Sequence, residues 1–197
     1  LWERGGLPAV RVLGGFQAAA GLLAEYEHLE AMSPKELREQ YEEMGLPRAK
    51  GTEVGTVRGR LKSAYTWWAL PLAALRKECA ERGVPAPEVA PSEKEKEDAA
   101  KERLVQQLLI REGFSKEELD GIPVERLQTI QAVRQVVEEF KPYQSMPIAE
   151  LKNGCTEHGV PPEPGMDWRE ALSQRIPMAL VWSWLPLEEL CKERWQR

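Results

Sequence analysis

One tripeptide, a glycine followed by an aliphatic residue and a proline, returns at nearly constant spacing along the whole chain. Its successive glycines lie 39, 38, 38 and 38 residues apart, at Gly6, Gly45, Gly83, Gly121 and Gly159. A fixed period of this size is typical of arrays of supersecondary units that bury their apolar faces against their neighbours. The spacing therefore predicts a repeat protein.

Apolar side chains with helical spacing precede several of these glycines. Triplets with steps i, i+3 and i+7 occupy equivalent places: Pro34, Leu37 and Tyr41; Leu72, Leu75 and Cys79; Ile148, Leu151 and Cys155. This spacing puts each triplet on one face of a short helix. We expect the repeated glycine to form a left-handed C-terminal cap, and the proline two residues later to prevent the helix from resuming.

A second helix is expected after a polar loop in every unit, over residues 14–30, 58–68, 98–111, 124–140 and 168–180. The predicted fold is all-α, an elongated array of about five helix-loop-helix repeats with a period of about 38 residues. The expected boundaries are a partial repeat over residues 1–31, repeats over 32–70, 71–111, 112–144 and 145–184, and the start of another over 185–197.

The fourth unit departs from the pattern, because Gly113 stands where Leu37, Leu75 and Leu151 stand elsewhere. Its first helix should be short, with Phe114 and Leu119 filling the space. At the start of the chain, Leu1 is not Met, and the first residues resemble the tail of an earlier repeat. These features predict that the chain is a piece of a longer precursor.

Composition argues against several functional classes. The 197 residues carry a net charge of −5, and the 27 Lys and Arg residues are dispersed, which gives no overall attraction to phosphate backbones or anionic lipid. Three cysteines without CxxC spacing and two histidines suggest neither a disulfide framework nor a metal site. We expect Cys79 and Cys155, two periods apart, to be buried as small apolar residues. No apolar run is long enough to span a bilayer.

No catalytic constellation stands out. The glycine-rich stretches 14–15 and 51–55 lack the Lys-Ser/Thr of a phosphate-binding loop and follow no expected strand. We therefore predict a protein that is not an enzyme and holds no cofactor and no metal.

Aromatic residues gather at the joints between predicted repeats, in a first group of Tyr65, Trp67 and Trp68 and a second group of Trp182 and Trp184. One interpretation is that these rings staple adjacent repeats together. The other is a docking surface, because neighbours such as Trp67 and Trp68 differ in direction by roughly 100° and cannot both face inward. Contact with a membrane surface is a third option, although an accompanying basic face is lacking.

The stretch from Leu151 to Ile176, with Gly159-Val160-Pro161 between two helical patterns, resembles the SAP motif and its helix-extension-helix relatives. Residues 45–61 and 75–108 look similar, with longer loops. SAP modules bind DNA through basic residues near the turn and the second helix. Here Arg48 and Lys50 fit that role in one unit, but Glu88, Glu125 and Glu163 take the place in others. Acidic residues at this position repel a phosphate backbone.

The tandem pattern Leu-Pro-Leu followed by Leu75, Cys79 and Gly83-Val84-Pro85 is also similar in style to repeat proteins of dinoflagellate-type algae. That resemblance implies a non-catalytic subunit of an organellar assembly, such as a photosystem or a respiratory complex, on the soluble face of a plastid membrane complex. The leading hypothesis is thus a scaffold or linker bound along a larger protein assembly. The alternative is a SAP-type nucleic-acid-binding module, with a basic patch of Arg48, Lys50, Arg58, Arg60 and Lys62.

Overall fold

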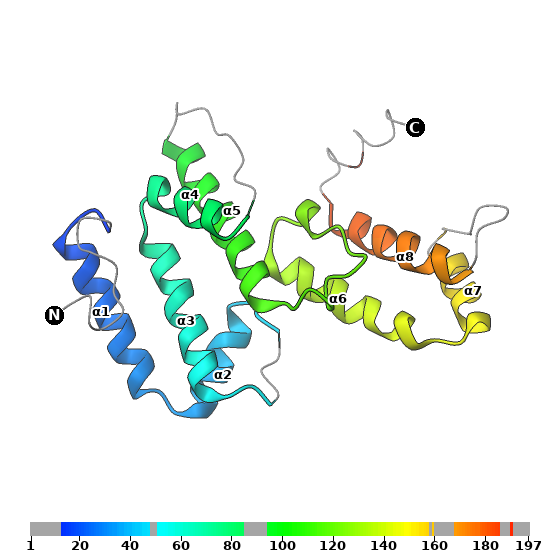
Figure 1. Ribbon diagram of the computed structural model, residues 1–197, viewed down its shortest axis with the longest axis horizontal. Helices are drawn as coiled ribbons and strands as arrows, with labels where there is room; N and C mark the ends of the chain where they lie inside the picture. Colours follow the sequence, from blue (N-terminus) through cyan, green and yellow to red (C-terminus); the bar gives the residue numbers. More distant parts are fainter. Residues whose placement is uncertain are drawn as a thin grey trace. The chain divides into compact units, whose positions relative to one another are not determined.

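The computed structural model describes residues 13–47, 51–84, 94–157, 159, 168–185 and 190. All regular elements in these residues are helical, eight α-helices and one 3-10 helix, and no strand occurs among them (Figure 1). The all-α class predicted from the sequence is therefore confirmed. The chain divides into two compact units, Leu1–Gly113 and Phe114–Arg197.

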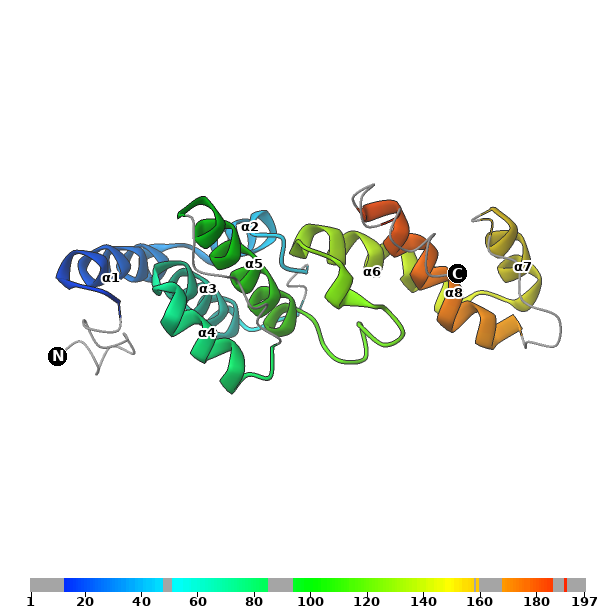
Figure 2. The same cartoon turned by 90° about the horizontal axis from the view of Figure 1, so that it is seen from above.

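Long and short helices alternate in the first unit. The long helices are α1 (Phe16–Ala31), α3 (Val54–Ala69) and α5 (Lys94–Gly113), and the short ones are α2 (Pro34–Glu43) and α4 (Leu72–Glu81). Helix α3 packs against α1 and α5, while α2 packs on α3 and α4 packs on α5. Each short helix joins the ends of two long ones, so consecutive long helices run in opposite directions (Figures 1 and 2).

The short helices begin and end at the residues that the sequence marks. Ser33 and Glu36 form a capping box at the start of α2, and α4 begins directly after Pro71. At the end of α2, Gly45 has φ 91°, and the Leu46 amide donates to the Tyr41 carbonyl at 3.3 Å. Gly83 repeats this arrangement after α4, with φ 66°. Both ends are Schellman caps, which turn the aliphatic residue after the glycine back into the core.

The buried faces of the short helices contain fewer residues than the predicted triplets. Leu37 and Tyr41 of α2 are buried, as are Leu75 and Cys79 of α4. The first member of each triplet is not fully buried: Pro34 and Ile148 are exposed, and Leu72 is half-buried. These residues stand at the first position of their helices, and in α2 and α4 the buried residues are the i, i+4 pair nearer the middle.

The second unit contains the 3-10 helix η2 (Val124–Arg126) and the helices α6 (Ile130–Ser145), α7 (Ile148–Glu157) and α8 (Trp168–Trp184). Both α6 and α7 pack against α8. Its core includes buried aliphatic and aromatic side chains of η2–α6 and α8: Leu127, Ile130, Val133, Val136, Phe140, Ile176, Leu180 and Val181. The continuous helix predicted over residues 124–140 is wrong, because the chain leaves helical geometry at Leu127 and α6 starts afresh after the N-cap Thr129.

The expected short helix at the start of the fourth unit is also absent. Helix α5 continues through Gly113, and residues 115–121 form successive turns. Ser115 and Glu118 still exchange the two hydrogen bonds of a capping box, at 2.9 and 3.2 Å, and Gly121 is left-handed with φ 77°. Only five residues lie between Ser115 and Gly121, which leaves no room for a ten-residue helix. Phe114 is buried here as predicted, and Leu119 is half-buried.

Candidate interaction surfaces

Trp67 is a core residue that joins α3 to α4. Its side chain is 2% exposed, and its indole N–H donates to Glu78 Oε1 at 3.4 Å. The Arg82 guanidinium lies 5.2 Å from the centre of the Trp67 ring, donates to Glu78 at 2.7 Å and reaches Glu112 of α5 at 3.2 Å. Trp67 therefore staples neighbouring helices, and its buried ring has no surface to offer a partner.

Trp68, the next residue, is 38% exposed, which makes it one of the few large apolar side chains at the surface of the described residues. The two rings leave the helix in directions about 100° apart, so burial of one does not require burial of the other. The structure thus separates the two interpretations of this aromatic group. Trp67 fits the stapling role, and Trp68 has the accessible ring that an interface anchor needs.

Tyr65 takes an intermediate position. Its hydroxyl accepts a hydrogen bond from Gln40 Nε2 of α2, and its side chain is half-buried. Burial, assisted by the negative charge of Glu25, raises the pKa of the Tyr65 hydroxyl above its ordinary value. The hydrogen bond with Gln40 engages the phenol within the first unit, so Tyr65 supports α2 more than it offers an outward anchor.

The second aromatic group lies at the end of α8. Trp182 is half-buried and Trp184 is 45% exposed. They flank Ser183, and Leu185 beyond them is buried. Each aromatic group therefore presents one ring to solvent at the C-terminal end of a long helix.

Three of the five basic side chains proposed for nucleic-acid binding, those of Arg58, Arg60 and Lys62, contact other residues of the first unit. Lys62 pairs with Glu30 of α1 at 2.6 Å, and Arg58 contacts the same carboxylate at 3.4 Å. Arg60 donates to the Tyr41 hydroxyl at 2.7 Å. The hydrogen bond from Lys62, together with the charges of Lys62 and Arg58, lowers the pKa of Glu30, although its partial burial acts in the opposite direction.

These contacts tie α3 to α1 and α2, and they reduce the charge available to a phosphate backbone. Arg48 and Lys50, the other two members of the predicted patch, lie outside the described residues. The sequence could not show this pairing, because Glu30 is 32 residues from Lys62.

The remaining chemistry is sparse. Cys79 is a buried free thiol, and burial raises its pKa, which suits an inert packing residue. The side chain of Cys155 is outside the described residues. In the part of the chain that the structure describes, no three His, Cys, Asp or Glu residues gather as a metal site would require. Within the same part, every helix is too short or too polar to cross a membrane.

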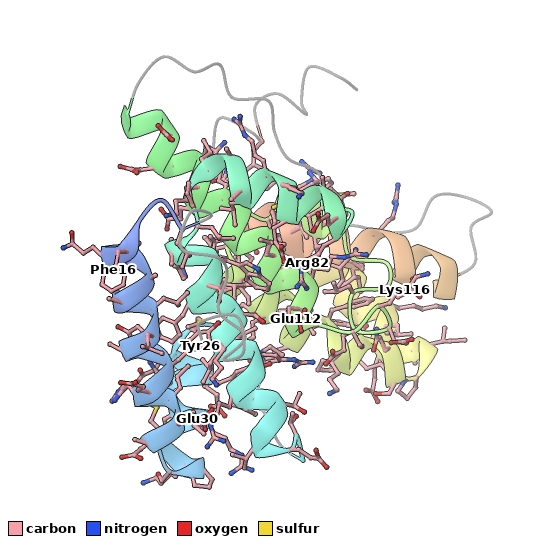
Figure 3. The ribbon with its side chains drawn as sticks, turned by 60° about the vertical axis from the view of Figure 1, so that its left-hand side comes forward. Phe16, Tyr26, Glu30, Arg82, Glu112 and Lys116 are labelled. Carbon is pink, nitrogen blue, oxygen red and sulfur yellow. The ribbon has the colours of Figure 1, made fainter. Side chains whose placement is uncertain are left out.

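An open groove lies between the end of α4 and the end of α5. It is lined by Glu81, Arg82, Leu108, Arg111 and Glu112. Arg82 and Glu112 pair across it at 3.2 Å (Figure 3). Since this ion pair spans the groove, its charges serve to hold α4 on α5. We therefore read it as a structural contact.

Comparison of the chain with protein-family models, with curated proteins and with solved structures finds no match in any of the three.

Sequence reasoning missed two features of these surfaces. Phe16, in the first turn of α1, is 68% exposed (Figure 3). Arg82 organises the Trp67–Glu78–Glu112 contacts. The Glu78 and Arg82 spacing of i, i+4 was a visible signal for a helix-surface pair, but nothing in the sequence marked Trp67 or Glu112 as further partners.

Proposed function

We propose that this protein is a non-catalytic helical-repeat scaffold that binds along a larger protein assembly, with Trp68 as a principal anchor. The proposal rests on one observation about two adjacent tryptophans: Trp67 is buried in the core, and Trp68 is exposed at the surface. An exposed Trp on a rigid helix is the kind of side chain that dominates protein–protein binding energy. Trp184, exposed at the end of α8, is the second proposed anchor.

Several structural details support the repeat part of the proposal. Gly45, Gly83, Gly121 and Gly159 are all left-handed, and they stand 38 residues apart in the sequence. Helices of ten residues alternate with helices of 16 to 20 residues in both units. An array of this kind suits a scaffold, because each unit adds contact surface without altering the others.

The proposal is tested by a matched pair of variants. Tagged wild-type protein is used to capture partners from an extract of its native source, alongside Trp68→Ala and Trp68→Phe. We expect Trp68→Ala to lose the partner while its unfolding temperature stays within the range of an ordinary surface change, and Trp68→Phe to retain it. Equal capture by all three proteins would contradict the role of Trp68.

Trp67→Ala is the complementary variant in this experiment. It should destabilise the first unit by about 3–5 kcal/mol, because it removes a fully buried ring. The identity of captured proteins then tests the suggested host, since subunits of a photosystem or respiratory complex would support an organellar assembly. A mobility shift with duplex DNA that weakens steeply with salt would instead favour the nucleic-acid alternative.

A further inference from the structure

Helix α7 contains the only asparagine of the chain, Asn153, and a glycine follows it directly. Helix α7 packs on α8, and the Asn153 side chain is exposed. In an asparagine-glycine pair, the backbone nitrogen of the glycine can attack the side-chain carbonyl carbon of the asparagine, because no Cβ of the second residue crowds the approach. This pair is therefore the place in the chain where loss of a side-chain amide is chemically easiest.

Position 154 also lacks a contact that holds the other two short helices in place. In the 38-residue register, Gly154 corresponds to Gln40 of α2 and Glu78 of α4. Gln40 Nε2 donates to the Tyr65 hydroxyl, and Glu78 Oε1 accepts from the indole N–H of Trp67 at 3.4 Å. Both bonds join a short helix to α3, whereas a glycine has no side chain with which to make one.

The sequence of α7 also weakens the helix itself. A glycine in a helix interior costs backbone entropy. The Thr156 hydroxyl donates to the Lys152 carbonyl at 2.8 Å, and a bond of this kind competes with the helical backbone bond. Leu151 is buried, whereas the other side chains that the structure describes in α7 are exposed. Since a ten-residue helix depends on packing to persist in water, α7 has fewer described contacts against local opening than α2 or α4.

We propose that Asn153 is a site of spontaneous deamidation controlled by local opening of α7. While α7 is closed, helical backbone angles keep the Gly154 nitrogen away from the Asn153 side chain. When α7 opens, the Gly154 nitrogen loses its proton to hydroxide and forms a bond to Asn153 Cγ. The bond from Cγ to Nδ2 breaks, the amide takes a proton from water and leaves as ammonia, and a succinimide ring remains. Water then opens the ring at either carbonyl, which gives aspartate or isoaspartate.

The products of this reaction are unfavourable for α7. A carboxylate at position 153 lies three residues after Glu150 and four before Glu157, and like charges at these spacings repel on a helix surface. The position is also in the C-terminal half of α7, where the helix dipole disfavours negative charge. Isoaspartate adds a methylene group to the main chain, which breaks the helical hydrogen-bond pattern. The isoaspartyl product therefore makes a transient opening of α7 permanent.

Peptide mapping by mass spectrometry follows the reaction in the purified full chain, incubated at mildly alkaline pH in native buffer and in concentrated urea. Cleavage after glutamate yields the peptide 151–157, in which Asn153 carries the only side-chain amide. The ratio of the native rate to the rate in urea measures the fraction of time that α7 is open. We expect deamidation in native buffer, at a lower rate than in urea.

Three variants test the control by α7. Lys152→Gly loosens the middle of α7 beside an unchanged asparagine-glycine pair, and it should raise the ratio of native to urea rates by roughly three- to fivefold. Arg76→Gly is the matched control, because Arg76 has the same register position in α4, two periods earlier. Its ratio should equal that of the wild type. Gly154→Ala should lower the native rate by about fivefold or more, since alanine favours the helix and its Cβ crowds the attack.

An amide that stays intact in the native chain, a native rate equal to the rate in urea, or equal acceleration by Lys152→Gly and Arg76→Gly would overturn the proposal. Hydrogen exchange on the same samples separates local opening from unfolding of the whole second unit. We expect the amides of α7 to exchange faster than those of α6, and exchange of both helices at one rate would also contradict the proposal. None of these readouts involves Trp68, so the result is independent of partner capture by the proposed scaffold surface.

Discussion

Helix α2 and the segment 115–121 start and stop with the same local devices but fold differently. Ser33 with Glu36, and Ser115 with Glu118, both form capping boxes. Gly45 and Gly121 are both left-handed. Yet α2 is a ten-residue helix, and 115–121 is a series of turns. The two regions differ in the spacing of these signals and in the core pair. Gly45 lies twelve positions after Ser33, and α2 buries Leu37 and Tyr41, whereas Gly121 lies only six positions after Ser115.

Caps therefore set the ends of these short helices, while packing on a neighbour holds their middles. In the 38-residue register, Gly113 and Glu117 replace the Leu75 and Cys79 pair of α4. A helix of about ten residues is too short to be stable alone in water. Without such a buried pair, the Ser115 capping box and Gly121 form only isolated turns. The division of the chain into two units falls at this place, between Gly113 and Phe114.

The largest effect should come from giving α2 the residue found at position 113. Leu37→Gly removes a fully buried side chain and adds the backbone entropy of glycine, so we expect a loss of about 3–6 kcal/mol in the unfolding free energy of the first unit. Urea denaturation followed by far-UV circular dichroism measures it. A change under about 1 kcal/mol, typical of surface sites, would show that α2 does not depend on its core pair.

The next effect concerns the left-handed caps. Gly83 has φ 66°, and a β-branched side chain is strained there even though a Cβ would meet no atom within 4 Å. We expect Gly83→Val to cost roughly 1 kcal/mol or more. Gly55, an exposed helical glycine without positive φ, provides the control in Gly55→Ala, which should be neutral or stabilising. An unchanged melting temperature in Gly83→Val would argue against the cap.

A smaller effect distinguishes the two capping boxes. Ser33→Ala should cost about 1 kcal/mol, because the Ser33 hydroxyl accepts a hydrogen bond from the Glu36 amide at the start of a real helix. Ser115→Ala removes the equivalent bond from a turn segment, and we expect a change within about 0.5 kcal/mol. Thermal unfolding of the two variants measures both losses of stability. A larger loss in Ser115→Ala than in Ser33→Ala would contradict the distinction between α2 and residues 115–121.

The smallest effect is a pH dependence at the same box. The hydrogen bonds with Ser33 lower the pKa of Glu36 below its ordinary value of 4.5. A carboxyl with a lowered folded-state pKa stabilises the fold at pH values above 4.5, and that contribution is lost as the pH falls through the lowered pKa. The stability difference between wild type and Glu36→Gln should therefore shrink on acidification. A difference that stays constant into the acid range would argue against the ionised box.

Much of the secondary structure could be predicted from the sequence, because its signals are local. Ser33, Gly45, Pro71 and Gly83 act within a few residues of themselves, and the helix ends follow them. The break of the 124–140 pattern at Leu127 was missed, since its apolar spacing continues across the break. The proposed repeat boundaries and count stay predictions.

The candidate surfaces were less predictable, because they depend on pairs that are distant in sequence. Periodicity showed that Trp67 and Trp68 point in different directions, but it could not say which one α4 covers. The contacts of Arg58 and Lys62 with Glu30 become visible only when α1 lies beside α3.

Native-state hydrogen exchange at residue resolution tests most directly the claim that neighbouring helices, and not local signals, hold the short helices together. We expect amides near Tyr41 in α2 and Cys79 in α4 to be protected nearly as strongly as those of α3, whereas amides of residues 116–120 should exchange rapidly despite the Ser115 box. Equal protection of 116–120 and α2, or rapid exchange throughout α2 and α4 in a folded chain, would contradict it.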